Sequence, residues 1–272
     1  MTDRYAVVGN PVGHSKSPAI HAEFALQTGQ KLEYGSLLAP LDGFRETVLR
    51  FRDEDGQGLN VTVPFKTDAF ALATTLTSRA RDAEAVNTLK FDHDRIIGDN
   101  TDGAGLIRDL IHNLGFTLER KRILLVGAGG AAQGVLFPLL HQEPALIVVA
   151  NRTLDRAREM QAKVEKRDVL ERTVQAQTFE SLAGLSFDLV INATSAGLTD
   201  SALPIPRGVF AADALAYEMM YGRDTPFMRF AREEGAQVAD GLGMLVEQAA
   251  ESFYLWRDVR PDTRPVIEKL RQ

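Results

Sequence analysis

One stretch of the sequence constrains the fold more than any other: ILLVGAGGAAQG, at residues 123–134. Its four leading apolar residues predict a buried strand, and a glycine-rich turn and an apolar helix follow directly. Gly127 and Gly129 match the first two glycines of the dinucleotide-binding fingerprint, and Ala132 stands at its last position, where alanine is accepted. Such glycines let backbone N–H groups approach a pyrophosphate at a helix start. The sequence therefore predicts a Rossmann-type domain here.

The following predicted strand, in ALIVVANRT at residues 145–153, indicates which dinucleotide is bound. NAD-binding domains end this strand with Asp or Glu, which holds the ribose 2′-hydroxyl. Here Asn151 takes that place, Arg152 and Arg156 follow, and Thr153 adds a hydroxyl. Guanidinium groups suit a 2′-phosphate, which an acidic residue would repel. We expect NADP rather than NAD; the alternative is that both arginines belong to a solvated helix face.

Composition excludes several other classes of protein. The chain has 272 residues, 31 Lys and Arg against 37 Asp and Glu, a net charge of −6, and no cysteine. Disulfides, thiolate catalysis and cysteine-bound metals are thereby excluded, and no basic run suggests a nucleic-acid partner. The N-terminal residues predict a strand rather than a signal peptide, and no apolar run approaches the ~18 residues of a membrane span. We expect a cytoplasmic protein that binds neither nucleic acid nor membrane.

Strand and helix patterns alternate along most of the chain, which predicts an α/β fold with parallel sheets and crossover helices. A helix is expected at residues 17–29, where Ser17 can cap it and Gly29 can end it. Single helices are also expected at residues 69–84, 103–116 and 243–256. The pattern changes near residue 105, which suggests a second domain.

Polar residues at predicted turns are candidates for binding and catalysis. In LNVTVPFK, Pro64 ends an alternating strand and leaves Lys66 beside its end. Other candidates are Asn87 in AVNT, Asp99 and Asp102 in GDNTDG, and the serines of GHSKSP. Simpler readings remain open: an exposed lysine, helix capping by Ser17, and ordinary turn chemistry for the acids. No further acids or histidines cluster with them, so no metal is expected.

Eight motifs occur in order: GNPVGHSKSP, NVTVPFK, AVNT, GDNTDG, GAGGAA, NRT, NATSAG and DGLGMLVEQAA. Together they cover the chain from Val8 to about Pro265, and this set resembles the shikimate dehydrogenase family. The resemblance implies a two-domain α/β protein: a substrate and catalytic domain at 1–104 and 242–272, and an NADP-binding Rossmann domain at 105–241. It also implies that the C-terminal helices pack back on the first domain, with the active site in the cleft between domains.

The resemblance further implies site residues. The pair matching Lys66 and Asp102 is catalytic. Substrate contacts are expected from the carboxylate-binding Ser15, Ser17 and Tyr217 and from Thr62, Lys66, Asn87, Asp102 and Gln248. Cofactor contacts are expected from Gly127, Ala128, Gly129, Gly130, Ala131, Asn151, Arg152, Thr153, Arg156, Leu215 and Gly241, with a weaker assignment at Ser78. On its predicted helix, Gln248 interrupts an apolar stripe, so it either meets a polar partner or lies at the edge of the stripe.

The implied reaction is the reversible, NADPH-dependent reduction of 3-dehydroshikimate to shikimate in chorismate and aromatic amino-acid biosynthesis. Lys66 is either the proton shuttle or a permanent charge that stabilises the alkoxide. The alternatives are a quinate/shikimate dehydrogenase with broader cofactor use and a non-catalytic ligand sensor. Two serines at 15 and 17 and the NRT stretch speak against the first alternative, and the presence of Lys66 and Asp102 speaks against the second. Either a monomer or a homodimer fits the sequence.

Overall fold

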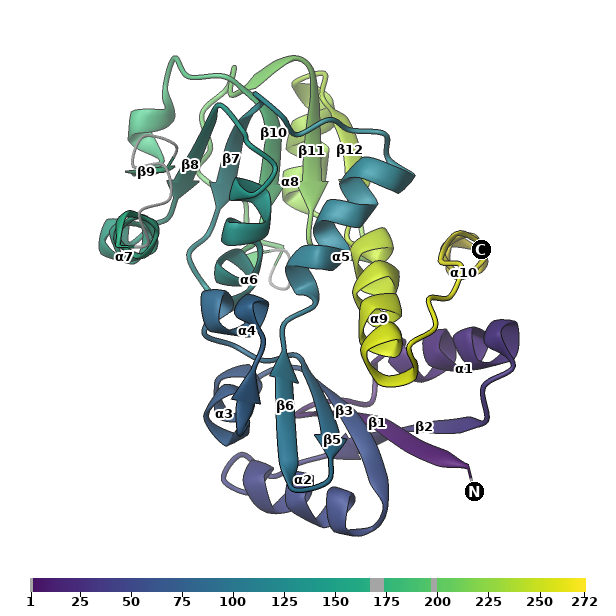
Figure 1. Cartoon of the computed structure of the whole chain (residues 1–272). Helices are drawn as coiled ribbons and strands as arrows, with labels where there is room; N and C mark the ends of the chain where they lie inside the picture. The colour runs from purple at the N-terminus through teal and green to yellow at the C-terminus, as the bar shows by residue number, and fades with distance from the viewer. Residues whose placement is uncertain (1, 167–173, 197–199) are drawn as a thin grey trace. The chain divides into compact units, whose positions relative to one another are not determined.

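The computed structural model describes residues 2–166, 174–196 and 200–272, and the chain divides into two compact units. The first unit runs up to Leu106 and resumes at Leu245, and the second unit is Ile107–Met244. The sequence analysis had placed these boundaries at residues 104 and 242. Figure 1 shows the two units, each built on its own sheet.

The first unit holds a six-stranded sheet in the order β2-β1-β3-β5-β6-β4. Its strands are β1 (Asp3–Gly9), β2 (Leu32–Leu38), β3 (Gly56–Val61), β4 (Thr75–Leu76), β5 (Thr88–Asp92) and β6 (Arg95–Asp99). Its helices are α1 (Ser17–Thr28), α2 (Phe44–Asp53), α3 (Lys66–Leu72), α4 (Ser78–Ala83) and α10 (Arg264–Arg271), together with most of α9 (Leu242–Arg257). The sheet is mixed rather than parallel, because β5 runs antiparallel to both β3 and β6.

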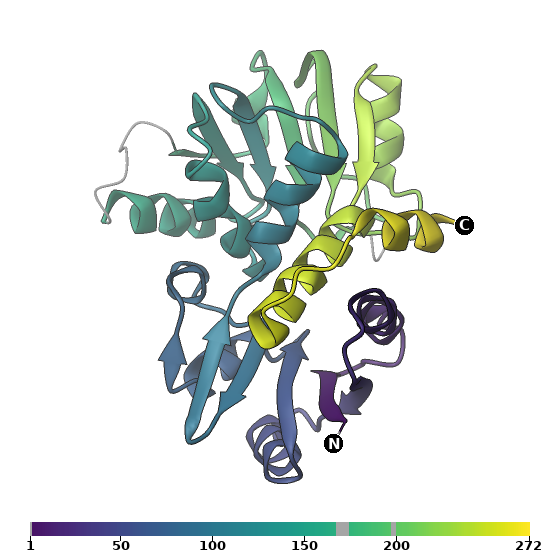
Figure 2. The same cartoon turned by 45° about the vertical axis from the view of Figure 1, so that its right-hand side comes forward.

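Each face of this sheet is covered by its own set of helices. On one face α2, α3 and α4 bury a core around Phe44, Val48 and Leu59. A second apolar cluster joins α1 to α9 and α10, with Phe24 and Phe253 fully buried. Trp256 on α9 also donates to the Leu89 carbonyl at 2.9 Å. The C-terminal helices therefore pack on the first unit, as the sequence analysis predicted (Figure 2).

The second unit holds a parallel six-stranded sheet in the order β12-β11-β10-β7-β8-β9. Its strands are β7 (Arg122–Val126), β8 (Leu146–Ala150), β9 (Val174–Gln177), β10 (Phe187–Asn192), β11 (Phe210–Glu218) and β12 (Gln237–Asp240). Its helices are α6 (Gly130–Leu140), α7 (Leu154–Glu165), the short η2 (Glu180–Leu182) and α8 (Pro226–Glu233). Helices α6 and α8 cover opposite faces of the sheet (Figure 1), and the central strands β7 and β10 are almost fully buried. This is the doubly wound arrangement predicted from the glycine motif.

Two predicted helices differ from the structure. Residues 69–84 hold the end of α3, the short strand β4 and the whole of α4. Thr75 and Leu76 extend the sheet beside β6, and this pairing outweighs their place in a helical pattern. The helix expected at 103–116 begins earlier, as α5 (Asp102–Arg108), and continues as a π-helical turn, η1 (Asp109–Asn113).

Within the described ranges, no helix combines the length and the apolar character that a membrane crossing requires.

Candidate active site

One edge of the first sheet collects most of the predicted substrate residues. Strands β1 and β3 are parallel, so their carboxyl ends reach the same edge. Strand β5 runs the other way, and its first residue, Thr88, pairs there with Asp99 at the end of β6. The segments that follow β1, β3 and β6 and precede β5 carry the GHSKSP, NVTVPFK, GDNTDG and AVNT motifs. The strand order thus brings four separate motifs to one edge.

Lys66 and Asp102 form an ion pair at this edge. Lys66 Nζ lies 2.5 Å from Asp102 Oδ2. The two residues begin α3 and α5, so each side chain starts from a fixed helix end. The lysine side chain is 28% exposed and the carboxylate 11% exposed, which leaves the ammonium accessible while the carboxylate is largely enclosed. This arrangement gives a proton donor next to an anion that can orient it.

The Asn87 side chain organises the groups around the pair. Its amide nitrogen lies within hydrogen-bonding distance of Asp102 Oδ1 at 2.8 Å, of Thr101 Oγ1 at 3.0 Å and of Gln248 Oε1 at 3.2 Å. Its amide oxygen accepts from the Thr101 backbone N–H at 2.9 Å. Asn87 is almost completely buried, so these contacts satisfy a side chain that would otherwise be costly to enclose. The carboxylate of Asp102 is therefore held from both sides, by Asn87 and by Lys66.

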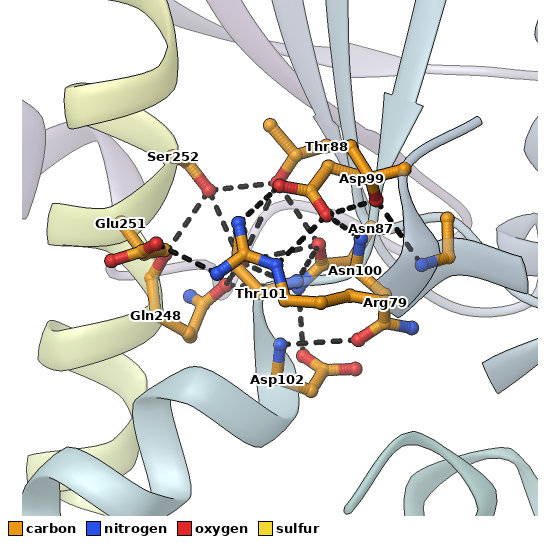
Figure 3. A network of polar contacts seen from close by, with 12 residues as sticks. Arg79, Asn87, Thr88, Asp99, Asn100, Thr101, Asp102, Gln248, Glu251 and Ser252 are labelled. Carbon is orange, nitrogen blue, oxygen red and sulfur yellow. Dashed lines mark hydrogen bonds and ion pairs between the residues drawn. The ribbon is translucent and has the colours of Figure 1, made fainter. Parts of the chain in front are cut away.

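Gln248 reaches this cluster from α9, far along the chain. Its amide nitrogen donates to the Leu245 carbonyl at 3.0 Å, and its oxygen lies 3.3 Å from Thr101 Oγ1. Of the two readings left open for Gln248, the structure supports the one in which it meets polar partners. Figure 3 shows Gln248, Asn87, Thr101 and Asp102 converging from α9, the residue before β5 and the segment after β6.

Ser15 and Ser17 lie between β1 and the start of α1, and Thr62 directly follows β3. Ser15 Oγ accepts from the Ser17 backbone N–H at 3.2 Å, and Ser17 itself is the first residue of α1, with Lys16 at the cap position. The predicted capping role of Ser17 is therefore wrong, because Lys16 occupies the cap position and Ser17 is already the first residue of the helix. Thr62 donates its backbone N–H to the Val8 carbonyl at 2.9 Å.

Sequence reasoning missed a buried hydroxyl cluster behind Asn87. Ser252 Oγ lies 2.7 Å from Thr88 Oγ1 and accepts from Asn60 Nδ2 at 2.9 Å. Asn60 in turn accepts from the Tyr34 hydroxyl at 2.7 Å. The signal for this cluster was Asn60 in NVTVPFK and Thr88 in AVNT, because a buried strand rarely carries Asn or Thr without a partner.

The glycine motif of the second unit borders a cavity of about 680 Å³. Gly127 has φ 108°, and a Cβ added there would lie 3.0 Å from Thr194 Cγ2. Gly129 and Gly130 differ: a Cβ at either position would meet nothing within 4 Å, so their backbone faces open space at the start of α6. A cavity lined by bare backbone at the start of a helix fits a pyrophosphate.

The arginines of the NRT stretch also line this cavity. Asn151, Arg152 and Arg156 border it, together with the predicted Gly127, Ala128, Gly129, Gly130 and Ala131. Asn151 Nδ2 donates to the Thr153 carbonyl at 2.8 Å and so shapes the turn before α7. Both guanidinium groups are exposed, and neither has an ion-pair partner in the described part of the chain. They can therefore receive an anionic ligand without losing an existing contact.

Two predicted residues have buried positions that contradict their assignment. Tyr217 is fully enclosed within β11, and its hydroxyl donates to Asp109 Oδ2 at 2.6 Å. Burial, with the charge of Asp109 as a further cause, holds the pKa of Tyr217 well above its usual value. Leu215 is also inside β11 and is paired on both sides, with Leu189 and Gln237, so its backbone is engaged in the sheet. Neither position favours ligand contact, because ligands of α/β sheets bind at the segment after a strand rather than inside it.

Two other residues predicted to contact the cofactor, Thr153 and Gly241, do not border the cavity. Gly241 has a packing reason of its own, because a Cβ there would lie 2.2 Å from the Met219 carbonyl oxygen.

The structure brings additional residues to the cavity. Thr194, Ser195 and Ala196 follow β10, and Met220 follows β11. The last residue of the NATSAG motif, Gly197, lies outside the described residues. The signal for this set was their position directly after buried parallel strands, where α/β proteins bind ligands. Tyr221, next in the chain after Met220, is only partly buried and is a better candidate for ligand contact than Tyr217.

Within the described ranges, no group of three or more His, Cys, Asp or Glu side chains is placed to hold a metal ion.

The first unit has a mixed sheet and a Lys–Asp pair, and the second is doubly wound with a glycine-lined cavity. Together these features define a dinucleotide-dependent oxidoreductase. Three family models match the chain: "Shikimate dehydrogenase substrate binding domain" at residues 7–89, "Shikimate / quinate 5-dehydrogenase" at 109–199 and "Shikimate 5'-dehydrogenase C-terminal domain" at 241–271. The chain belongs to the shikimate dehydrogenase family.

Individual relatives agree with this assignment. The chain is 62% identical over 270 residues to the "Shikimate dehydrogenase (NADP(+))" of Methylobacillus flagellatus, covering 99% of each chain. Among solved structures, an Ael1 enzyme from Pseudomonas putida is 49% identical with a TM-score of 0.92, covering 99% of this chain and 98% of that one. A Thermus thermophilus shikimate 5-dehydrogenase in complex with NADP(H) and shikimate is 32% identical with a TM-score of 0.87, covering 99% of both chains.

Proposed function

We propose that this protein is an NADP-dependent shikimate dehydrogenase that reversibly reduces 3-dehydroshikimate to shikimate. The observation that carries the proposal is the Lys66–Asp102 pair, at 2.5 Å, in a chain 62% identical to a relative described as that enzyme. This reaction belongs to the pathway to chorismate and the aromatic amino acids, and we place the enzyme in the cytoplasm.

The first unit is proposed to bind shikimate. Ser15 and Ser17 take the carboxylate, and the ring hydroxyls are contacted by Thr62, Lys66, Asn87, Asp102 and Gln248. The shared edge of β1, β3, β5 and β6 supports this assignment, because it gathers polar groups from distant motifs. Tyr221 replaces Tyr217 in the proposed set, since Tyr217 is enclosed in its strand.

The second unit is proposed to bind NADP, and its cavity fits that cofactor. Open space at Gly129 and Gly130 admits the pyrophosphate, and Arg152 and Arg156 suit the 2′-phosphate. NADP held there would supply hydride chemistry at the carbon that carries the substrate's 3-oxygen.

The chain's own part in the reaction is proton transfer at that oxygen. Lys66 Nζ donates a proton to the oxygen during reduction and accepts one during oxidation. Asp102 orients the ammonium, and Asn87 holds Asp102 from the other side. A lysine held by an anion also stabilises negative charge that develops on the oxygen. All of these groups come from one chain, so the activity is compatible with a monomer as well as with a homodimer.

The test is a two-by-two assay of purified protein, with shikimate or quinate as substrate and NADP⁺ or NAD⁺ as cofactor. Reduced nicotinamide is followed by absorbance. Turnover confined to shikimate with NADP⁺ is the expected result. Turnover of quinate, or equal use of NAD⁺, would assign the protein to the broader quinate/shikimate dehydrogenases. No turnover by folded protein in any combination would overturn the enzymatic proposal and favour a ligand sensor.

A further inference from the structure

Arg79, on the short helix α4, bridges two carboxylates behind the proposed shikimate site. Its Nε donates to Asp99 Oδ1 at 3.1 Å, its Nη2 contacts Asp99 Oδ2, and its Nη1 donates to Glu251 Oε1 at 2.7 Å. Asp99 is fully buried at the end of β6, and Glu251 lies on α9. Figure 3 shows the guanidinium between these two elements. One side chain therefore ties together α4, β6 and α9.

The contact between Arg79 and Asp99 is connected to Asp102 by further hydrogen bonds. Asp99 Oδ1 accepts from the Asn100 backbone N–H at 2.8 Å. The Asn100 side chain donates to the Ala85 carbonyl at 3.1 Å and accepts from the Asp102 backbone N–H at 3.1 Å. These bonds fix the short segment between Asp99 and Asp102. The direction in which Asp102 meets Lys66 thus depends on how Asp99 is held.

The contact between Arg79 and Glu251 acts on α9, on the side of the helix that carries Gln248. Glu251 lies three residues after Gln248, so both face the same side of the helix. Its other oxygen accepts from Arg260 Nη1 at 2.6 Å. Burial raises the pKa of Glu251, but hydrogen bonds from Arg260 and Arg79 outweigh it, and the net pKa is lowered. A charged Glu251 anchors α9 in the position from which Gln248 contacts Asn87.

We propose that Arg79 is a positioning residue for the reaction: its guanidinium sets the Asp102 carboxylate through Asp99 and the Gln248 amide through Glu251. The proposal rests on the functions proposed above for Asp102 and Gln248. A planar, forked guanidinium suits this task because it makes several fixed contacts at once, which the single ammonium of lysine does not.

The contacts of Arg79 with Asp99 and with Glu251 should affect different kinetic parameters. Glu251→Gln loosens only α9, so we expect the shikimate KM to rise about fivefold with kcat within about twofold. Arg79→Lys keeps a positive charge but cannot hold both carboxylates, so we expect kcat to fall about tenfold and KM to rise. We also expect the pH at which kcat is half-maximal to shift in Arg79→Lys. If Arg79 only stabilised the fold, the substitution would reduce the amount of active enzyme and leave KM and the pH profile unchanged.

The experiment measures kcat, KM and the pH profile for wild type, Arg79→Lys, Glu251→Gln and the control Arg95→Gln. Arg95 lies on β6, the strand that also carries Asp99. Its side chain is 63% exposed and pairs with Asp92 at the surface, so kcat, KM and the pH profile should stay at wild-type values. Trp256 is the only tryptophan and lies in the first unit, so its emission reports folding of that unit.

Unchanged kcat, KM and pH profile in folded Arg79→Lys would overturn the positioning role while leaving the proposed function intact. If Arg79→Lys does not fold, Glu251→Gln decides alone, and an unchanged KM overturns the role. Absence of turnover in wild type would overturn the proposed function and the role of Arg79 with it.

Discussion

The two units prepare their proposed ligand sites in opposite ways. In the first unit, Lys66, Asn87, Asp102 and Gln248 already contact one another through short hydrogen bonds. In the second unit, the cavity is lined by bare glycine backbone and by arginines without ion-pair partners among the described residues. The first site is preorganised for positioning and proton transfer, and the second leaves room for a large anion. Substitutions in the first should therefore affect kcat most, and substitutions in the second should affect cofactor KM.

The largest effect is expected for Lys66→Ala. Removing the proposed proton donor should lower kcat about 1000-fold, within the range for general acid–base catalysis. Steady-state assays with saturating shikimate and NADP⁺ measure the effect, and Trp256 emission verifies the fold. Lys90→Ala is a matched control, because Lys90 lies in the same unit, on β5, but donates to the Leu255 carbonyl instead. A kcat within tenfold of wild type would contradict the proton-transfer role.

The next largest effect is expected at the arginines of the second unit. In the double variant Arg152→Gln/Arg156→Gln, we expect the NADP⁺ KM to rise about 100-fold, since each charge-assisted hydrogen bond contributes about 1.5–3 kcal/mol. The NAD⁺ KM should change less than about threefold, because NAD⁺ lacks the 2′-phosphate. Arg158→Gln is the control: Arg158 is on the same helix but pairs with Asp155 at 3.2 Å. An equal rise in KM for both cofactors would show that the arginines do not bind the 2′-phosphate.

A smaller effect on the cofactor site is expected for Gly127→Ala. The backbone φ of 108° disfavours a side chain, and the added Cβ would crowd Thr194. A strain of about 1–2 kcal/mol should raise the NADP⁺ KM about tenfold and leave kcat at saturation nearly unchanged. Gly184→Ala separates strain from binding, because Gly184 also has a positive φ, 81°, but does not border the cavity. If both variants raise KM equally, the effect of Gly127 is not local.

The smallest effect concerns acid stability of the first unit. Burial lowers the pKa of His21 from 6.5 to about 3, against the smaller opposing effect of Asn60. The unfolded chain therefore binds a proton that the folded chain does not, in the window between these two values. Stability from this group is fully present above pH 6.5 and is lost as pH falls toward 3, by about 1 kcal/mol between pH 6.5 and 5.5.

Urea unfolding followed by Trp256 emission measures this loss, and His21→Phe removes the titrating group while retaining an aromatic ring stacked on Tyr34. We expect the stability of His21→Phe to change less between pH 6.5 and 5.5 than that of wild type. The same pH dependence in both proteins would mean that His21 does not cause the loss.

Much of the fold and of the site was predictable from short motifs. The glycine turn predicted the parallel sheet and cavity of the second unit, because turn, strand and helix signals occur within a dozen residues. The motifs around Lys66 and Asp102 predicted a pair that the structure brings to 2.5 Å. The stretch ALAYE at residues 214–218 does not reveal where its strand ends, so the sequence could not show that Tyr217 and Leu215 lie inside β11.

The sequence by itself determined the type of each unit and the residues that carry charge at its turns, since these follow from local patterns of apolar, glycine and polar residues. Only the tertiary structure decided which distant groups meet. Asn87 contacts Gln248 across 161 residues, and Arg79 contacts Glu251 across 172. The physical reason is that a local pattern specifies which face of a strand or helix is buried, whereas the partner of a buried polar group depends on how whole elements pack.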